Sequence, residues 1–193
     1  MCSDAFLPIL NLNCLFLTNS CRHEYHSSSV EARKPVVRKT SSFMSESIER
    51  NKILTKAENQ LLQKQIEGDS LHTYLNSEQG FWYYYEKKDT SDAPMPVTGD
   101  QIVFNYEVRD LADQVIFSEE ELGPQSYFVD KEELISGLQD GLKLMREGER
   151  VTFLFPSYKA YGYTGSERIN PNQPLIYKVE LIKVNKLTDN EKN

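Results

Sequence analysis

The chain contains little cysteine, little histidine and no long run of basic residues. Its three cysteines, Cys2, Cys14 and Cys21, all precede residue 22, so the rest of the chain can hold neither a disulfide framework nor a thiolate metal site. His23 and His26 have no third ligand nearby, and no metal or cofactor is therefore expected. With a net charge of −7 and no basic stretch, the chain is not expected to bind nucleic acid.

The first 21 residues are predicted to be a signal peptide or lipoprotein leader outside the fold. Residues 6–17 form an apolar run that is too short to span a bilayer but has the length of a signal-peptide core. Residues 17–21, which end in Cys21, resemble an imperfect bacterial lipobox, in which Cys21 would carry a lipid. Because the stretch before the core lacks Lys and Arg and contains Asp4, the alternative is a hydrophobic leader without a lipid.

A flexible tether over residues 22–44 and a helical segment over 45–76 are predicted to follow. The tether is polar and serine-rich, whereas apolar residues recur at helical spacing over 45–67. A capping box at residues 55–58 and a stop at Gly68 predict two short helices. Such helices must pack on something: they either cover part of the main domain's sheet or form a dimerisation or partner-docking arm.

Residues 81–185 are predicted to form one α+β domain. Its strand signals are an aromatic run followed by segments of alternating apolar and polar residues. A single helical pattern covers residues 131–145. We therefore expect an antiparallel β-sheet wrapped on one short helix, preceded by the two short N-terminal helices. Residues 186–193 are expected to be a polar tail.

Within this domain, short motifs follow one another in a fixed order: Gly99-Asp100, Phe104-Asn105-Tyr106, Val115-Ile116-Phe117, residues 134–142, Met145 with Gly148-Glu149, Ala160-Tyr161-Gly162 and residues 175–181. This order resembles the FK506-binding-protein (FKBP) family of peptidyl-prolyl cis/trans isomerases. The resemblance covers about residues 81–184 and implies an FKBP-like fold. Residues 31–35 and 80–85 further resemble a subfamily of bacterial lipoproteins associated with gliding motility. That resemblance implies lipid anchoring on the periplasmic face of the cell envelope of a Gram-negative-type bacterium.

The resemblance implies isomerisation of Xaa-Pro bonds of envelope proteins during folding. This chemistry needs neither a nucleophile nor a general base, because the barrier of about 18–20 kcal/mol comes from amide resonance. An apolar aromatic pocket and a few donors are sufficient. The implied catalytic residues are Tyr106, Phe117, Ile135 and Tyr161, and the implied substrate-binding residues are Leu134, Leu138, Ile169 and Tyr177.

The chain departs from the usual family pattern at three positions. Leu138 would form the floor beneath the proline ring, where the family often has Trp. Ser118 stands where Asp is common, and Gln125 stands where an aromatic residue is frequent. These departures keep an alternative open, in which the domain is a non-catalytic chaperone or an assembly subunit of a motility or secretion complex. In a further alternative the chain is a structural anchor that binds through residues 45–67.

Overall fold

The computed structural model describes residues 40–90 and 93–186. The predicted leader with Cys21, the tether up to residue 39 and the tail beyond Lys186 lie outside the described residues. Within the described ranges, no helix is long and apolar enough to cross a membrane. Everything described here belongs to one compact unit, which begins at residue 38.

The N-terminal helical segment is one continuous helix, α1 (Thr40–Gly68), of 29 residues. The prediction of two short helices is therefore wrong, and the last residues assigned to the tether are helical. No Pro or Gly lies between residue 40 and Gly68, so nothing breaks the helix once it has begun. The capping-box residues 55–58 lie inside α1, and the predicted stop at Gly68 is correct.

All strand pairings in the seven-stranded sheet are antiparallel. The strand order is β1-β2-β6-β7-β3-β4, and β5 pairs with the first half of β3. This arrangement confirms the α+β prediction. Besides the predicted helix, the domain contains a short helix α2 and a 3₁₀ turn η1 that the sequence did not indicate. The remaining elements are β1 (Leu75–Asn76), β2 (Trp82–Lys87), β3 (Gln101–Arg109), β4 (Val115–Phe117), α2 (Glu119–Leu122), β5 (Gln125–Phe128), α3 (Ser136–Leu142), β6 (Arg150–Phe155), η1 (Ser157–Lys159) and β7 (Leu175–Asn185).

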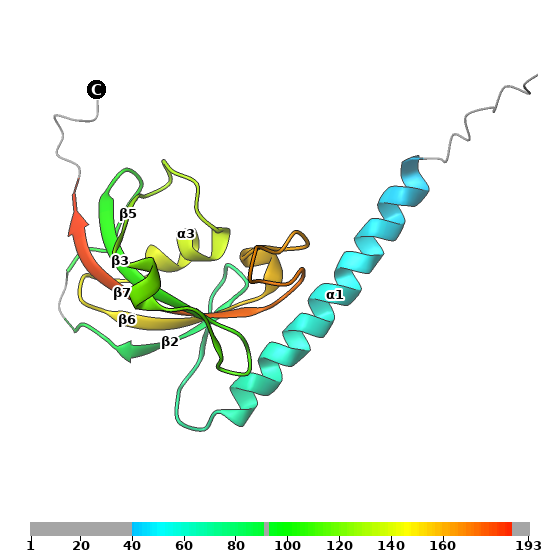
Figure 1. Ribbon diagram of the computed structural model, residues 1–193, viewed down its shortest axis with the longest axis horizontal. Coiled ribbons are helices and arrows are strands. Elements are labelled where there is room, and N and C mark those ends of the chain that lie inside the picture. Colours follow the sequence, from blue (N-terminus) through cyan, green and yellow to red (C-terminus); the bar gives the residue numbers. More distant parts are fainter. Residues whose placement is uncertain (1–39, 91–92, 187–193) are drawn as a thin grey trace, which may run out of the picture. The chain divides into compact units, whose positions relative to one another are not determined.

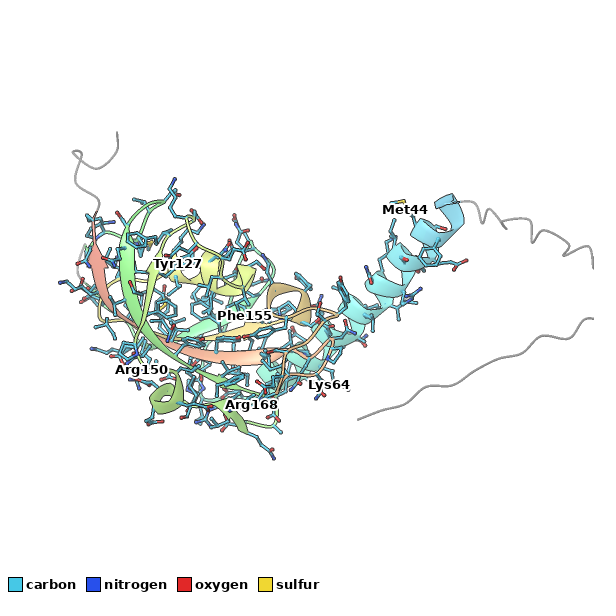
Figure 2. All side chains as sticks on the ribbon, turned by 45° about the horizontal axis from the view of Figure 1, so that its top comes forward. Met44, Lys64, Tyr127, Arg150, Phe155 and Arg168 are labelled. Atoms are coloured by element: carbon cyan, nitrogen blue, oxygen red, sulfur yellow. The ribbon has the colours of Figure 1, made fainter. Side chains whose placement is uncertain are left out.

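Helix α3 lies across one face of the curved sheet and closes the main core (Figure 1). Two glycines one turn apart allow this close approach. A Cβ atom on Gly137 would lie 2.8 Å from Cδ1 of Phe155, and one on Gly141 would lie 2.9 Å from Cε1 of Phe153. Figure 2 shows Phe155 in the space between the sheet and α3. The Gly-Leu-x-x-Gly motif therefore has a packing role, because it buries Leu138 between the two glycines.

The C-terminal half of α1 packs on the opposite face of the sheet. Leu62 is fully buried against Leu154 of β6 and Ile176 of β7, which are partners across the two strands. The side chain of Glu58 accepts hydrogen bonds from the backbone N–H and the hydroxyl of Ser157, at 2.8 and 2.7 Å. These contacts agree with the interpretation that this segment covers part of the sheet. The partner-docking arm stays a prediction.

A turn held by Asp69 leads the chain from α1 back to the sheet. Its carboxylate accepts hydrogen bonds from the Leu71 N–H at 2.9 Å, from Nδ1 of His72 at 2.7 Å and from the Tyr74 hydroxyl at 2.9 Å. The His72 ring stacks on Tyr84 of β2, with 4.1 Å between ring centroids. The hydrogen bond from His72, followed by that from Leu71, lowers the pKa of Asp69 to about 2.

Candidate functional site

The fold brings all the predicted site residues into one apolar cluster on the α3 side of the sheet. They come from β3, the end of β4, the segment entering α3, α3 itself, the connection between β6 and β7, and β7. Residues distant in sequence therefore meet because antiparallel pairing places β3 beside β7 and α3 above them. The predicted residues in this cluster are Tyr106, Phe117, Leu134, Ile135, Leu138, Tyr161, Ile169 and Tyr177.

These residues differ in how much surface they offer to a ligand. Three of the predicted substrate-binding residues are almost sealed in the core: Leu138 and Tyr177 are 1% exposed and Ile169 is 2% exposed. The other predicted residues are half-buried at the border of the core. A ligand would therefore contact this border directly and would be supported from below by the buried residues.

The aromatic part of the site consists of Tyr106, Phe117, Tyr161 and Tyr177, which we call the aromatic cluster. The rings of Tyr106 and Tyr177 stack, with 5.9 Å between centroids and 15° between planes. Burial, followed by the neighbouring Tyr161, raises the pKa of Tyr177 well above the usual range, and the same causes raise the pKa of Tyr106. Both hydroxyls are therefore protonated at neutral pH and can act as donors.

Two potential donors at the site have no ordinary partner within the described part of the chain. The Tyr177 hydroxyl is buried and makes no hydrogen bond of normal geometry, although Tyr161 lies beside it. The backbone N–H of Ile135, which precedes the first turn of α3, also makes no hydrogen bond. The N–H of Ile135, a half-buried residue at the border of the core, can hold a substrate carbonyl oxygen. The Tyr177 hydroxyl is sealed in the core beneath the site. In the described ranges no group of acidic, His or Cys side chains is arranged to hold a metal ion.

Arg168 is a residue of the site that sequence reasoning missed. Its guanidinium lies over the ring of Phe117, 4.6 Å from the centroid, in a cation–π contact. It also donates to the carbonyl of Ile116 at 3.2 Å and to both carboxylate oxygens of Glu121. Figure 2 shows Arg168 at the periphery of the domain. Because Arg168 lies 52 residues from Ile116, no local pattern in the sequence indicates this contact.

Ser118 and Gln125, the two departures flanking α2, have local structural roles. The Ser118 hydroxyl caps α2 by accepting from the N–H of Glu121 at 3.2 Å. The Gln125 side chain donates to the carbonyls of Leu122 and Gly123, at 2.8 and 3.3 Å. Both side chains therefore stabilise the turn between β4 and β5.

The family model for FKBP-type peptidyl-prolyl cis-trans isomerases matches residues 93–182. This part of the chain is similar to the FKBP family, and we call it the FKBP-like domain. The matched range includes all the predicted site residues, from Tyr106 to Tyr177. The FKBP-like domain thus contains the complete aromatic cluster.

The chain is also similar to curated peptidyl-prolyl cis-trans isomerases. The chain is 29% identical over 101 residues to a probable FKBP-type peptidyl-prolyl cis-trans isomerase FkpA of Neisseria meningitidis serogroup B, which covers 52% of this chain and 37% of that protein. It is 33% identical over 103 residues to the peptidyl-prolyl cis-trans isomerase Mip of Coxiella burnetii, which covers 53% of this chain and 44% of the relative. The chain therefore spans less than half the length of these relatives.

The fold also resembles a crystal structure of a peptidyl-prolyl cis-trans isomerase from Pseudomonas syringae pv. tomato. The TM-score is 0.56 and the identity is 24%, over 70% of this chain and 96% of that structure. At this level of identity the likeness supports the FKBP fold alone.

Proposed function

We propose that the FKBP-like domain is a peptidyl-prolyl cis/trans isomerase that acts on Xaa-Pro bonds of unfolded polypeptides. The observation that carries this proposal is that the family match covers one apolar cluster containing every residue implied for the reaction. A prolyl bond exchanges in tens to hundreds of seconds without catalysis. A folding chain therefore gains from any site that lowers this barrier.

The aromatic cluster suits the chemistry of a twisted imide. Rotation removes the amide resonance, so the carbonyl oxygen loses negative charge and the bond becomes less polar. An apolar, water-poor surrounding then stabilises the twisted state more than the planar one. Tyr106 and Phe117 would surround the proline ring above Leu138. The Tyr161 hydroxyl and the Ile135 N–H would each bind a substrate carbonyl and hold the twist.

The proposed setting is the cell envelope. Cys21 lies four residues after the end of the apolar run of residues 6–17, and lipid attachment there would hold the FKBP-like domain at the periplasmic face of a membrane. We also propose that the protein belongs to the gliding-motility lipoprotein subfamily. The possible lipid site at Cys21 and the resemblance of residues 31–35 and 80–85 to that subfamily support this proposal. The clients would then be envelope proteins that are still folding. Mass spectrometry of the protein from its native membrane should show a diacylglycerol on Cys21, and an unmodified mature terminus would refute the anchor.

The alternative is a binding subunit that holds proline-containing segments without useful turnover. Ser118 supports this alternative, because it replaces the carboxylate common in the family and caps α2 instead. In such a subunit, the first half of α1 could bind a second copy or another subunit of a complex. Phe43, Met44 and Ile48 are more than half exposed there and would supply the apolar contacts.

Cis-to-trans exchange in a short Xaa-Pro peptide tests the proposal. The full-length protein should accelerate exchange, and Tyr161→Phe should lower kcat/KM about five- to tenfold by removing one hydrogen bond. Phe117→Ala should lower it at least tenfold through lost apolar contact. Val115→Ala is the matched control, since Val115 lies on the same strand and is 47% exposed. No acceleration by a folded protein would refute the enzyme, and peptide binding without acceleration would support the alternative.

A further inference from the structure

A groove of about 380 Å³ lies between α1 and the connection from β6 to β7. One wall comes from Leu54 and Thr55 of α1, and the other comes from Tyr158, Ala160 and Tyr161. Figure 1 shows this connection, in orange, beside α1. The volume lies within the range of about 300–1,000 Å³ that is typical of ligand sites.

The walls of the groove are fixed in place. The hydrogen bonds from Ser157 to Glu58 join the two walls directly. The ring of Tyr158 is held by its hydroxyl, which donates to the carbonyl of Gly80 at 2.9 Å. The connection is further braced by the N–H of Gly162, which donates to the Ser157 carbonyl at 2.8 Å. A preformed groove binds a chain at a lower entropic cost than a mobile one.

The groove is continuous with the aromatic cluster. Tyr161 and Ala160 line the groove and also pack against the core that contains Tyr106 and Tyr177. A polypeptide whose proline lies in the aromatic cluster could therefore extend past Tyr161 and along α1. No other predicted site residue lies in the groove lining.

The chemistry of the lining indicates what kind of segment would fit. Among the described residues, Glu58 is the only charged one that lines the groove. Both of its carboxylate oxygens already accept hydrogen bonds from Ser157, and the side chain is buried. The remaining lining is aliphatic, aromatic or neutral and polar. The groove would thus favour uncharged side chains and would penalise an unpaired charge.

We propose that this groove extends the substrate site and binds uncharged residues that flank the isomerised Xaa-Pro bond in an unfolded polypeptide. The proposal rests on the proposed function, because it assigns the groove to the same substrate. A short peptide would use the aromatic cluster alone, whereas a longer segment would also contact α1. Helix α1 would then contribute directly to the choice of client.

The test compares a proline tetrapeptide with an uncharged peptide of a dozen residues that has proline at its centre, using the full-length protein. Leu54→Arg places a charge in the groove, and Leu54 belongs to neither core cluster. Ile53→Arg is the matched control, since Ile53 is adjacent, 62% exposed and outside the groove. We expect Leu54→Arg to lower kcat/KM about tenfold for the long peptide and less than twofold for the tetrapeptide. Ile53→Arg should match the wild type for both.

Fluorescence anisotropy of the labelled long peptide gives a second readout that does not depend on turnover. If the wild type fails to accelerate the tetrapeptide, the isomerase proposal fails. In that case, a tenfold weaker affinity of Leu54→Arg for the long peptide would still support the proposal that the groove binds polypeptide. Equal affinity in both proteins would overturn the proposal. An equal loss for both peptides would also overturn it, because the substitution would then act through the position of Tyr161. Tighter binding in Leu54→Arg would overturn it by showing that the groove is filled by another segment of the chain.

Discussion

Replacing Gly137 by alanine should destabilise the FKBP-like domain, because α3 has no room for a methyl group at that position. The added Cβ would lie 2.8 Å from Cδ1 of Phe155 and 2.9 Å from the backbone carbonyl oxygen of Lys159. A ring can rotate, but the backbone of Lys159 is held in the turn η1. The helix would therefore have to move away from both β6 and η1.

The size of the effect follows from two opposing contributions. Alanine favours the helix over glycine by at most about 1 kcal/mol, while overpacking a core costs about 1–3 kcal/mol. At Gly137 the contact with backbone places the cost at the upper end, so the free energy of unfolding should fall by about 2 kcal/mol. At Gly141 the added Cβ would meet only ring atoms of Phe153, at 2.9 to 3.3 Å. A small shift of the ring should limit that loss to about 1 kcal/mol or less.

Urea unfolding of the full-length protein measures these differences, read from midpoints at constant slope. Gly68→Ala is the matched control, because nothing lies within 4 Å of its Cβ position at the end of α1. It should change stability by no more than about 0.5 kcal/mol. A Gly137→Ala protein as stable as the wild type, or less affected than Gly141→Ala, would refute the reasoning.

Two further predictions follow from buried and paired polar groups. Tyr177→Phe removes a buried hydroxyl without a normal partner and should raise the free energy of unfolding by about 1 kcal/mol; a lower urea midpoint would contradict this. Asp69 has its pKa lowered from 3.8 to about 2 in the folded state, so its contribution is complete above pH 4 and is lost as the pH falls toward 2. Stability should therefore fall less steeply over that window in Asp69→Asn than in the wild type, and parallel curves for the two proteins would show that the carboxylate is not responsible.

The sequence predicts the α+β class of the FKBP-like domain because the signals of its elements are local. Alternation of Ile102, Phe104 and Val108 predicts β3, and its existence is confirmed. Its place beside β7 comes from the tertiary structure alone. The motif over residues 134–142 indicates α3, although the structure restricts the helix to Ser136–Leu142. Alternation and glycine spacing depend only on neighbours within a few residues, so the elements that they predict are present in the folded structure.

The same local reasoning failed for α1. The residues at 55–58 fit a capping box, which predicts that a helix starts there. The preceding helix contains no Pro or Gly, however, and extending a helix costs less free energy than nucleating a new one. The side chain of Glu58 bonds to Ser157, 99 residues away, rather than within a cap.

The sequence by itself determined the α+β class, the FKBP resemblance and the identity of the residues that form the aromatic cluster. The α+β class follows from residue type and spacing, which act over short distances along the chain. The residues of the aromatic cluster are those that the FKBP resemblance implies. Only the tertiary structure decided that Leu62 packs against Leu154, that Arg168 covers Phe117 and that α1 forms a groove beside Tyr161. Each of these contacts joins segments far apart in sequence, and their geometry exists only once the sheet has brought the segments together.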